Sequence, residues 1–65
     1  MTSTTMGFDE GFEDGYHAAI KGFACEFRIR DGEPYTTRGV RVVCDREFAL
    51  GHVAGWTRAI EDTPG

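Results

Sequence analysis

The chain has 65 residues, a net charge of −4 and a hydrophobic fraction of 40%. A chain of this length buries only about 60% of its unfolded surface, so we expect one thin-cored domain without a deep substrate pocket. The acidic balance disfavours non-specific binding to nucleic acid or to anionic membranes, and it is compatible with a basic protein partner.

The first six residues are small and polar, and they predict a flexible tail ahead of a single domain over residues 7–63. They have neither the cationic start nor the apolar core of a signal peptide. The chain also lacks an apolar run of about 18 residues, the length needed to span a membrane. We therefore expect a cytoplasmic protein in which Cys25 and Cys44 are reduced.

Residues 8–21 predict an amphipathic helix, because large apolar side chains recur at helical spacing from Phe8 onwards. Gly22 is a suitable C-terminal stop. The outer arc of this helix is entirely acidic, and carboxylates in its first turn suit the positive end of the helix dipole. The acidic residues are Asp9, Glu10, Glu13 and Asp14.

Residues 24–30 alternate between apolar and polar side chains and predict a half-buried strand, and residues 38–44 predict a second, antiparallel strand. Two registers remain open. If Ile29 pairs with Val40 across a longer loop, Cys25 lies opposite Cys44. If Asp31 and Gly32 form a tight two-residue turn, the two cysteines are separated.

Residues 46–62 predict a second helix, with Asp45 as its N-cap. Both helices carry the pattern Phe-x-x-Gly-x-x-x-Gly-aromatic-x-x-Ala-Ile. Paired Gly-x-x-x-Gly steps allow close backbone approach, so we expect two antiparallel helices with facing glycines and flanking rings. Alternatively, one glycine stripe is open to a partner. The expected packing residues are Phe8, Gly11, Gly15, Tyr16, Ala19, Phe48, Gly51, Gly55, Trp56 and Ala59.

In the second helix, apolar residues replace the four carboxylates of the first. Either this helix lies between the first helix and the hairpin, or Leu50 and Val53 form an exposed patch that supports a structural homodimer. We expect a monomer. The sequence as a whole predicts an α+β domain of order α-β-β-α, with two packed antiparallel helices and a two-stranded antiparallel hairpin.

Catalytic and metal-binding signatures are absent from the sequence. Cys25, Cys44, His17 and His52 lack zinc-site spacing, and the glycines match no phosphate-binding loop. We expect His52, in an aromatic position of the repeat, to be packed and hydrogen-bonded, and His17 to be exposed. The sequence therefore predicts a binding protein without cofactor, metal or enzymatic activity.

Two readings of the acidic arc remain open. It is either a solvated helix face or a negative surface that docks on Lys and Arg of a protein partner. In the second reading, Asp9, Glu10, Glu13 and Asp14 bind a protein that normally grips nucleic acid.

Two family resemblances bear on function. The segments Gly15-Tyr16-His17-Ala18-Ala19-Ile20, Pro34-Tyr35 and Gly55-Trp56-Thr57-Arg58-Ala59 resemble the ribosome modulation factor family, which implies a helix pair and a ribosome-associated regulator. That family is strongly basic and has a short connector in place of the hairpin, so only the helix pair is carried over.

The size, the charge, the α-β-β-α layout and the lack of catalytic residues resemble small phage-encoded anti-CRISPR proteins that inhibit type I systems. This resemblance implies a stoichiometric inhibitor in the bacterial host cytoplasm. It would present the acidic arc to the basic groove of a Cas subunit of the effector complex, as a mimic of DNA, without binding nucleic acid or a membrane.

Overall fold

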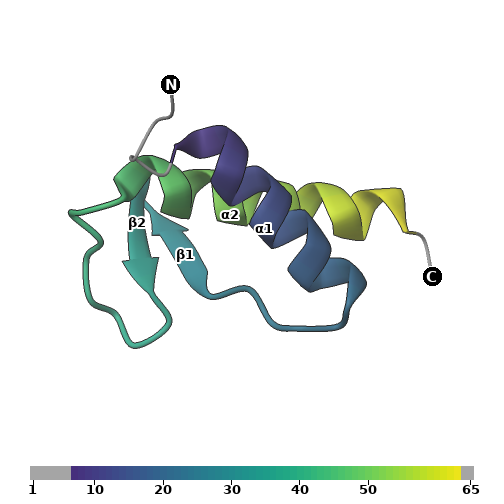
Figure 1. Ribbon diagram of the computed structural model, residues 1–65. Coiled ribbons are helices and arrows are strands. Elements are labelled where there is room, and N and C mark those ends of the chain that lie inside the picture. The colour runs from purple at the N-terminus through teal and green to yellow at the C-terminus, as the bar shows by residue number, and fades with distance from the viewer. Residues whose placement is uncertain (1–6, 64–65) are drawn as a thin grey trace, which may run out of the picture.

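The structure is a computed structural model that describes residues 7–63, so the predicted tail at residues 1–6 lies outside the described part of the chain. The elements are α1 (Phe8–Ile20), β1 (Phe27–Arg30), β2 (Glu33–Thr36) and α2 (Arg46–Asp62). This order and the packed helices confirm the predicted α+β fold. Figure 1 shows the two helices side by side, with the hairpin at one end of the molecule.

The helix ends follow from local sequence. At the start of α1, the Glu10 carboxylate accepts the Gly7 backbone N–H at 2.9 Å. At its end, Gly22 adopts a φ of +88°, and the Phe23 N–H reaches back to the Ala18 carbonyl at 2.8 Å. This pair of features is a Schellman motif, which satisfies helix carbonyls that would otherwise lack partners. The α1 bounds therefore agree with the prediction to within one residue.

The hairpin has the tight register. Asp31 and Gly32 adopt φ values of +53° and +78°, as a type I′ turn requires, and Arg30 pairs with Glu33. The predicted strand at residues 38–44 is therefore wrong, and so is the pairing of Ile29 with Val40. That segment instead contacts the other edge of β2, where the Val42 N–H donates to the Pro34 carbonyl at 2.9 Å.

Both cysteines are free thiols, Cys25 half-buried and Cys44 exposed. The register that would place them opposite each other does not form. Asp45 is the residue before α2, as predicted, but its φ of +58° is left-handed and its side chain makes no capping hydrogen bond. The backbone carbonyl of Asp45 accepts the Ala49 N–H at 3.0 Å and begins the helix.

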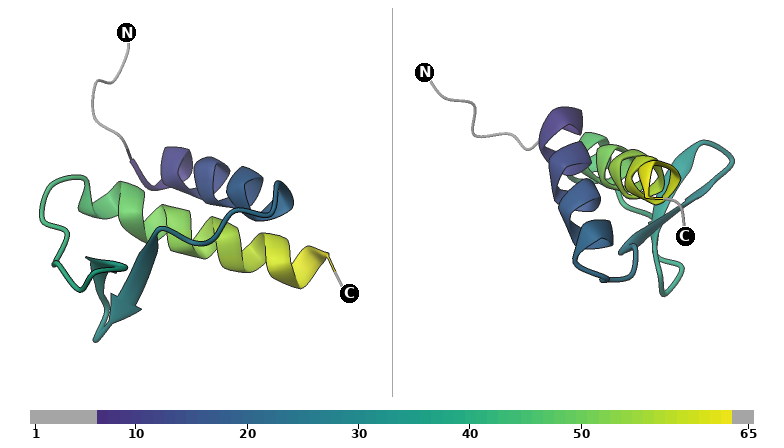
Figure 2. Two further views of the ribbon diagram at one scale, coloured as in Figure 1. Left: turned by 90° about the horizontal axis from the view of Figure 1, so that it is seen from below. Right: turned by 90° about the vertical axis from the view of Figure 1, so that its right-hand side faces the viewer.

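The two helices are parallel, and the predicted antiparallel arrangement is wrong. A Cβ atom on Gly11 would overlap the Phe48 carbonyl oxygen, and one on Gly15 would overlap that of His52. From Gly11 to Gly15 on α1, the contacted residue on α2 also moves forward by four, from Phe48 to His52. Figures 1 and 2 show α1 and α2 running the same way. The connection over residues 21–45 returns the chain to the end at which α1 starts.

The glycine contacts are reciprocal. Gly51 and Gly55 of α2 face the carbonyl oxygens of Phe8 and Phe12, just as the α1 glycines face those of α2. The repeat thus produces a helix pair related by an approximate two-fold axis that runs parallel to the helices. On each glycine a hydrogen points at the opposing carbonyl oxygen, the geometry of a Cα–H···O contact.

Helix α2 is the centre of the fold, because it contacts α1, β1 and β2. Figure 2 shows it between α1 and the hairpin, which confirms the first of the two predicted roles for its apolar arc. Ala49 and Ala59 are buried, while Leu50 and Val53 are half-buried. Because Leu50 and Val53 are half-buried, they leave less apolar surface for the predicted homodimer contact.

Candidate interaction surface

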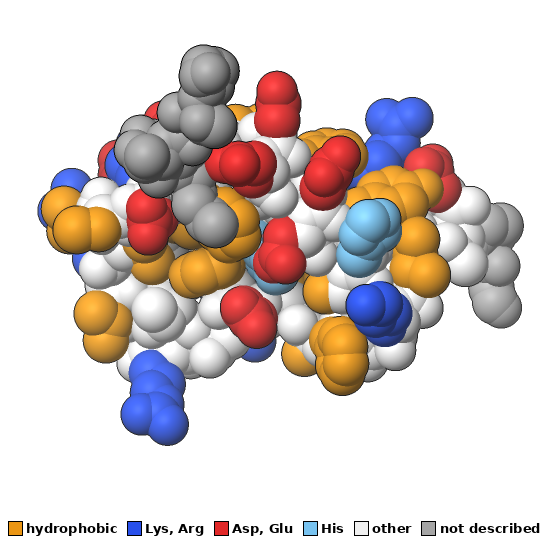
Figure 3. All heavy atoms as spheres, viewed as in Figure 1, with side chains coloured by type: hydrophobic (Ala, Val, Ile, Leu, Met, Phe, Trp, Pro, Cys, Tyr) orange, Lys and Arg blue, Asp and Glu red, His pale blue; other side chains and the backbone are white. Residues whose placement is uncertain are grey.

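The four predicted partner-binding carboxylates all lie on α1, and all four residues are exposed. In Figure 3, acidic side chains gather over α1 on the face turned to the viewer. No Lys or Arg within residues 7–63 forms an ion pair with them, whereas Arg46 pairs with Glu33 at 3.1 Å. That hydrogen bond holds the pKa of the Glu33 carboxyl below its usual value.

The four carboxylates are not equivalent. Glu10 caps the start of α1 through the Gly7 N–H, and Asp14 lies 2.9 Å from Nδ1 of His52 on α2. No hydrogen bond to another described residue involves the Asp9 or Glu13 side chains. The acidic surface therefore combines two carboxylates with structural bonds and two that face solvent.

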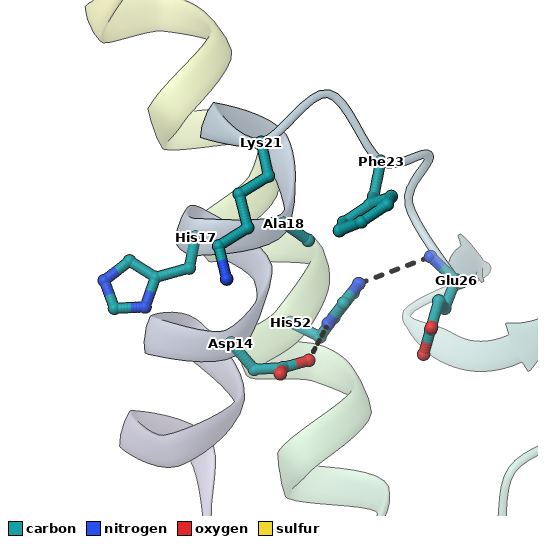
Figure 4. Close-up of a pocket in the computed structure, with 7 residues that line it drawn as sticks. All are labelled: Asp14, His17, Ala18, Lys21, Phe23, Glu26 and His52. Atoms are coloured by element: carbon teal, nitrogen blue, oxygen red, sulfur yellow. Dashed lines mark hydrogen bonds and ion pairs between the residues drawn. The ribbon is translucent and has the colours of Figure 1, made fainter.

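His52 links three parts of the fold. Its side chain is 1% exposed, and its Nε2 atom accepts the Glu26 backbone N–H at 3.3 Å. Because Nε2 accepts, the ring proton lies on Nδ1 and is donated to the Asp14 carboxylate. Figure 4 shows the imidazole between Asp14 of α1 and the Glu26 backbone. The edge-to-face contact with Phe27, at 5.3 Å between ring centroids, completes its packing.

This arrangement confirms the prediction that His52 is packed and hydrogen-bonded. From sequence, its partner Asp14 was assigned only to the acidic arc, as a solvated or partner-binding residue. The Asp14–His52 pair requires parallel helices, so it could not be expected from the antiparallel arrangement that the sequence predicted. His17 is exposed, as predicted, and it lines a shallow depression with Asp14 and His52, although its ring points away from His52 in Figure 4.

The hydrogen bonds of His52 connect parts of the fold to one another. Both ring nitrogens have partners within the fold, and the side chain is buried, so these contacts join α1, α2 and the segment before β1. Within residues 7–63, no group of three or more His, Cys, Asp and Glu side chains is arranged to hold a metal ion.

The remaining predicted packing residues flank the glycine contacts. Ala19 is half-buried, and the rings extend the two-fold relation. The Tyr16 hydroxyl donates to the Asp62 carboxylate at 3.0 Å, and Nε1 of Trp56 donates to the Phe23 carbonyl at 2.9 Å. Each ring therefore reaches from its own helix to the C-terminal end of the other helical segment. The bond to Asp62 raises the pKa of Tyr16.

A shallow hollow on the outside of α1 is lined by Phe8, Asp9, Phe12 and Glu13, and we call it the aromatic hollow. The Phe8 side chain is 42% exposed, and its ring centroid lies 6.3 Å from that of Phe12. The sequence assigned Phe8 only to helix packing. Exposed Phe8 and half-buried Phe12 also line the hollow together with the two carboxylates that lack partners among the described residues.

No family model, curated protein or solved structure matches this chain. The likenesses to the ribosome modulation factor family and to anti-CRISPR proteins therefore stay predictions. None of the helices described is both long and apolar enough to cross a membrane.

Proposed function

We propose that this chain is a small acidic binding protein that inhibits a nucleic-acid-handling complex by occupying a basic surface. The observation that supports the proposal is the exposed acidic surface of α1, in which Asp9 and Glu13 have no cationic partner among residues 7–63. A dense negative surface is complementary to a surface that normally binds phosphates, and complementary charge gives fast and selective docking.

The fold supports a binding role in a second way. The glycine contacts fix α1 against α2, so the carboxylates project from a rigid helix rather than from a loop. A rigid surface loses less conformational entropy on binding. We therefore propose stoichiometric inhibition rather than catalysis, with a Cas subunit of a type I CRISPR effector complex as the candidate target and the bacterial cytoplasm as the place of action.

The test is binding of target DNA by a panel of purified type I effector complexes, measured by gel mobility with and without the chain. Asp9→Lys/Glu13→Lys reverses the two solvated charges and leaves the Glu10 cap and the Asp14–His52 contact intact. The matched control, Glu47→Lys/Glu61→Lys, makes the same change of charge on exposed positions of α2.

We expect the wild type and the α2 control to block DNA binding by at least one complex, and the α1 variant to lose the block. Inhibition that survives in the α1 variant would remove the acidic surface from the mechanism. If the wild-type chain leaves DNA binding by every complex unchanged, the anti-CRISPR function is wrong.

A further inference from the structure

We propose that the aromatic hollow is a docking site for two arginine side chains that a helix of the partner protein presents on consecutive turns. This inference rests on the proposed function and names the chemistry of the partner at the same surface. The relevant residues are Phe8, Asp9, Phe12 and Glu13.

The first argument is the pairing of ring and carboxylate. Exposed Phe8, half-buried Phe12 and the carboxylates of Asp9 and Glu13 line one hollow. The rings form one i, i+4 row on α1 and the carboxylates form the neighbouring row, so a group in the hollow reaches both. A guanidinium group is planar, stacks on aromatic faces and binds a carboxylate through two hydrogen bonds. A Lys ammonium group matches only the charge. The hollow therefore favours Arg over Lys.

The second argument is spacing. The ring centroids of Phe8 and Phe12 are 6.3 Å apart, and the carboxylates are also four residues apart. Four residues along a helix rise about 6 Å, so arginines at positions i and i+4 of a partner helix match both pairs. Phosphates are excluded as ligands, because the hollow holds two carboxylates and no described cation.

The chain already contains one contact between an arginine and an aromatic ring. The Arg30 guanidinium lies 5.7 Å from the Tyr35 ring centroid on the hairpin. Since Arg28 and Arg30 are exposed on β1, a second copy of the chain is the competing occupant. Self-association distinguishes the two. A concentration-dependent dimer in sedimentation equilibrium that Arg28→Gln/Arg30→Gln abolishes would overturn the inference.

The direct test uses three synthetic alanine-based helical peptides as probes, titrated into the isotope-labelled full chain and followed by NMR. One carries Arg at i and i+4, the second carries Lys at those positions, and the third has its two Arg on opposite helix faces. We expect the first to bind about 3-fold or more tightly than the other two, with shift changes centred on residues 8–13.

Phe8→Leu keeps apolar volume at an exposed site and removes the ring, and we expect about 3-fold weaker binding of the Arg peptide. Phe23→Leu is the matched control at another exposed ring, 64% exposed. Phe8→Met is a second variant should Phe8→Leu lower the melting temperature. Asp9→Asn/Glu13→Gln should weaken binding about 10-fold.

The outcomes separate the two proposals. If the three peptides bind the wild type equally, or if both Phe8 variants bind the Arg peptide like the wild type, the arginine inference is overturned while the acidic surface remains. If Asp9→Asn/Glu13→Gln binds as tightly as the wild type, the carboxylates are irrelevant and the proposed function fails as well.

Discussion

Gly15 of α1 lies directly against the backbone carbonyl group of His52 on α2, with no room for a side chain between the helices. A Cβ atom there would lie 2.7 Å from the His52 carbonyl carbon, and the obstacle is backbone rather than a flexible side chain. This contact explains why helix-destabilising glycines occur in the middle of α1.

Gly15→Ala should therefore destabilise the protein. Alanine improves helix propensity by about 1 kcal/mol, but separating the two backbones costs about 2–3 kcal/mol or more, so the overlap outweighs the gain. Each kcal/mol lost lowers the melting temperature by about 4–8 °C in a domain of this size. Thermal unfolding followed by circular dichroism measures the effect.

The control is His17→Ala, which also introduces alanine on α1 but at an exposed position. Its melting temperature should stay close to that of the wild type. A Gly15→Ala protein as stable as this control would show that the helices are not in backbone contact.

The hydrogen bonds of His52 predict a specific cost on its removal. His52→Leu keeps a side chain of similar size but leaves the Glu26 N–H without its acceptor. An unsatisfied buried donor costs about 1–3 kcal/mol, and urea unfolding should report a loss in that range. The same substitution at exposed His17 should change the free energy of unfolding by no more than about 0.5 kcal/mol. Equal losses at both positions would contradict the buried link.

Tyr16 should titrate above the ordinary range for a tyrosine, because its hydroxyl proton is held by Asp62. The folded state favours the protonated phenol, so this contribution to stability is present at neutral pH and is lost as the pH rises through the raised pKa. Phenolate absorbance in a Tyr35→Phe background isolates Tyr16. Asp62→Ala should lower the pKa of Tyr16, whereas Glu61→Ala should leave it unchanged; a pKa indifferent to Asp62 would refute the contact.

The hairpin turn predicts that Gly32 resists substitution. Its φ of +78° is left-handed, and a Cβ there costs about 1–2 kcal/mol, so Gly32→Ala should destabilise by that amount. Asp31→Asn should be tolerated, because Asn-Gly is a preferred type I′ pair. Chemical denaturation of the two variants measures both effects. Equal stability of the two proteins would mean that the turn is not the one described.

Sequence reasoning worked where the signal is local. The helical rhythm from Phe8, the stop at Gly22 and the acidic arc are properties of single segments, and they gave the α1 bounds and the exposed carboxylates. Sequence reasoning did not predict how segments distant in the chain pack against each other. The glycine spacing identifies the faces in contact but is the same read in either direction, so it cannot set helix polarity.

The hairpin shows a related limit. The valine-rich run at residues 40–43 has strong strand propensity, but the Asp31-Gly32 turn sets the register before that run is reached. As a result Val40 and Val43 are exposed, at 62% and 73%. The Asp14–His52 contact could not be predicted either, because it requires the parallel helix pair.

The glycine contacts hold the helix that carries Asp9 and Glu13 against α2, so the most direct test is a nuclear Overhauser spectrum of the labelled protein. We predict contacts from the Gly11 α-protons to Phe48 and from the Gly15 α-protons to His52, with the reciprocal contacts from Gly51 to Phe8 and from Gly55 to Phe12. Contacts that run in opposite directions, with Gly11 near Gly55 and Gly15 near Gly51, would contradict the account.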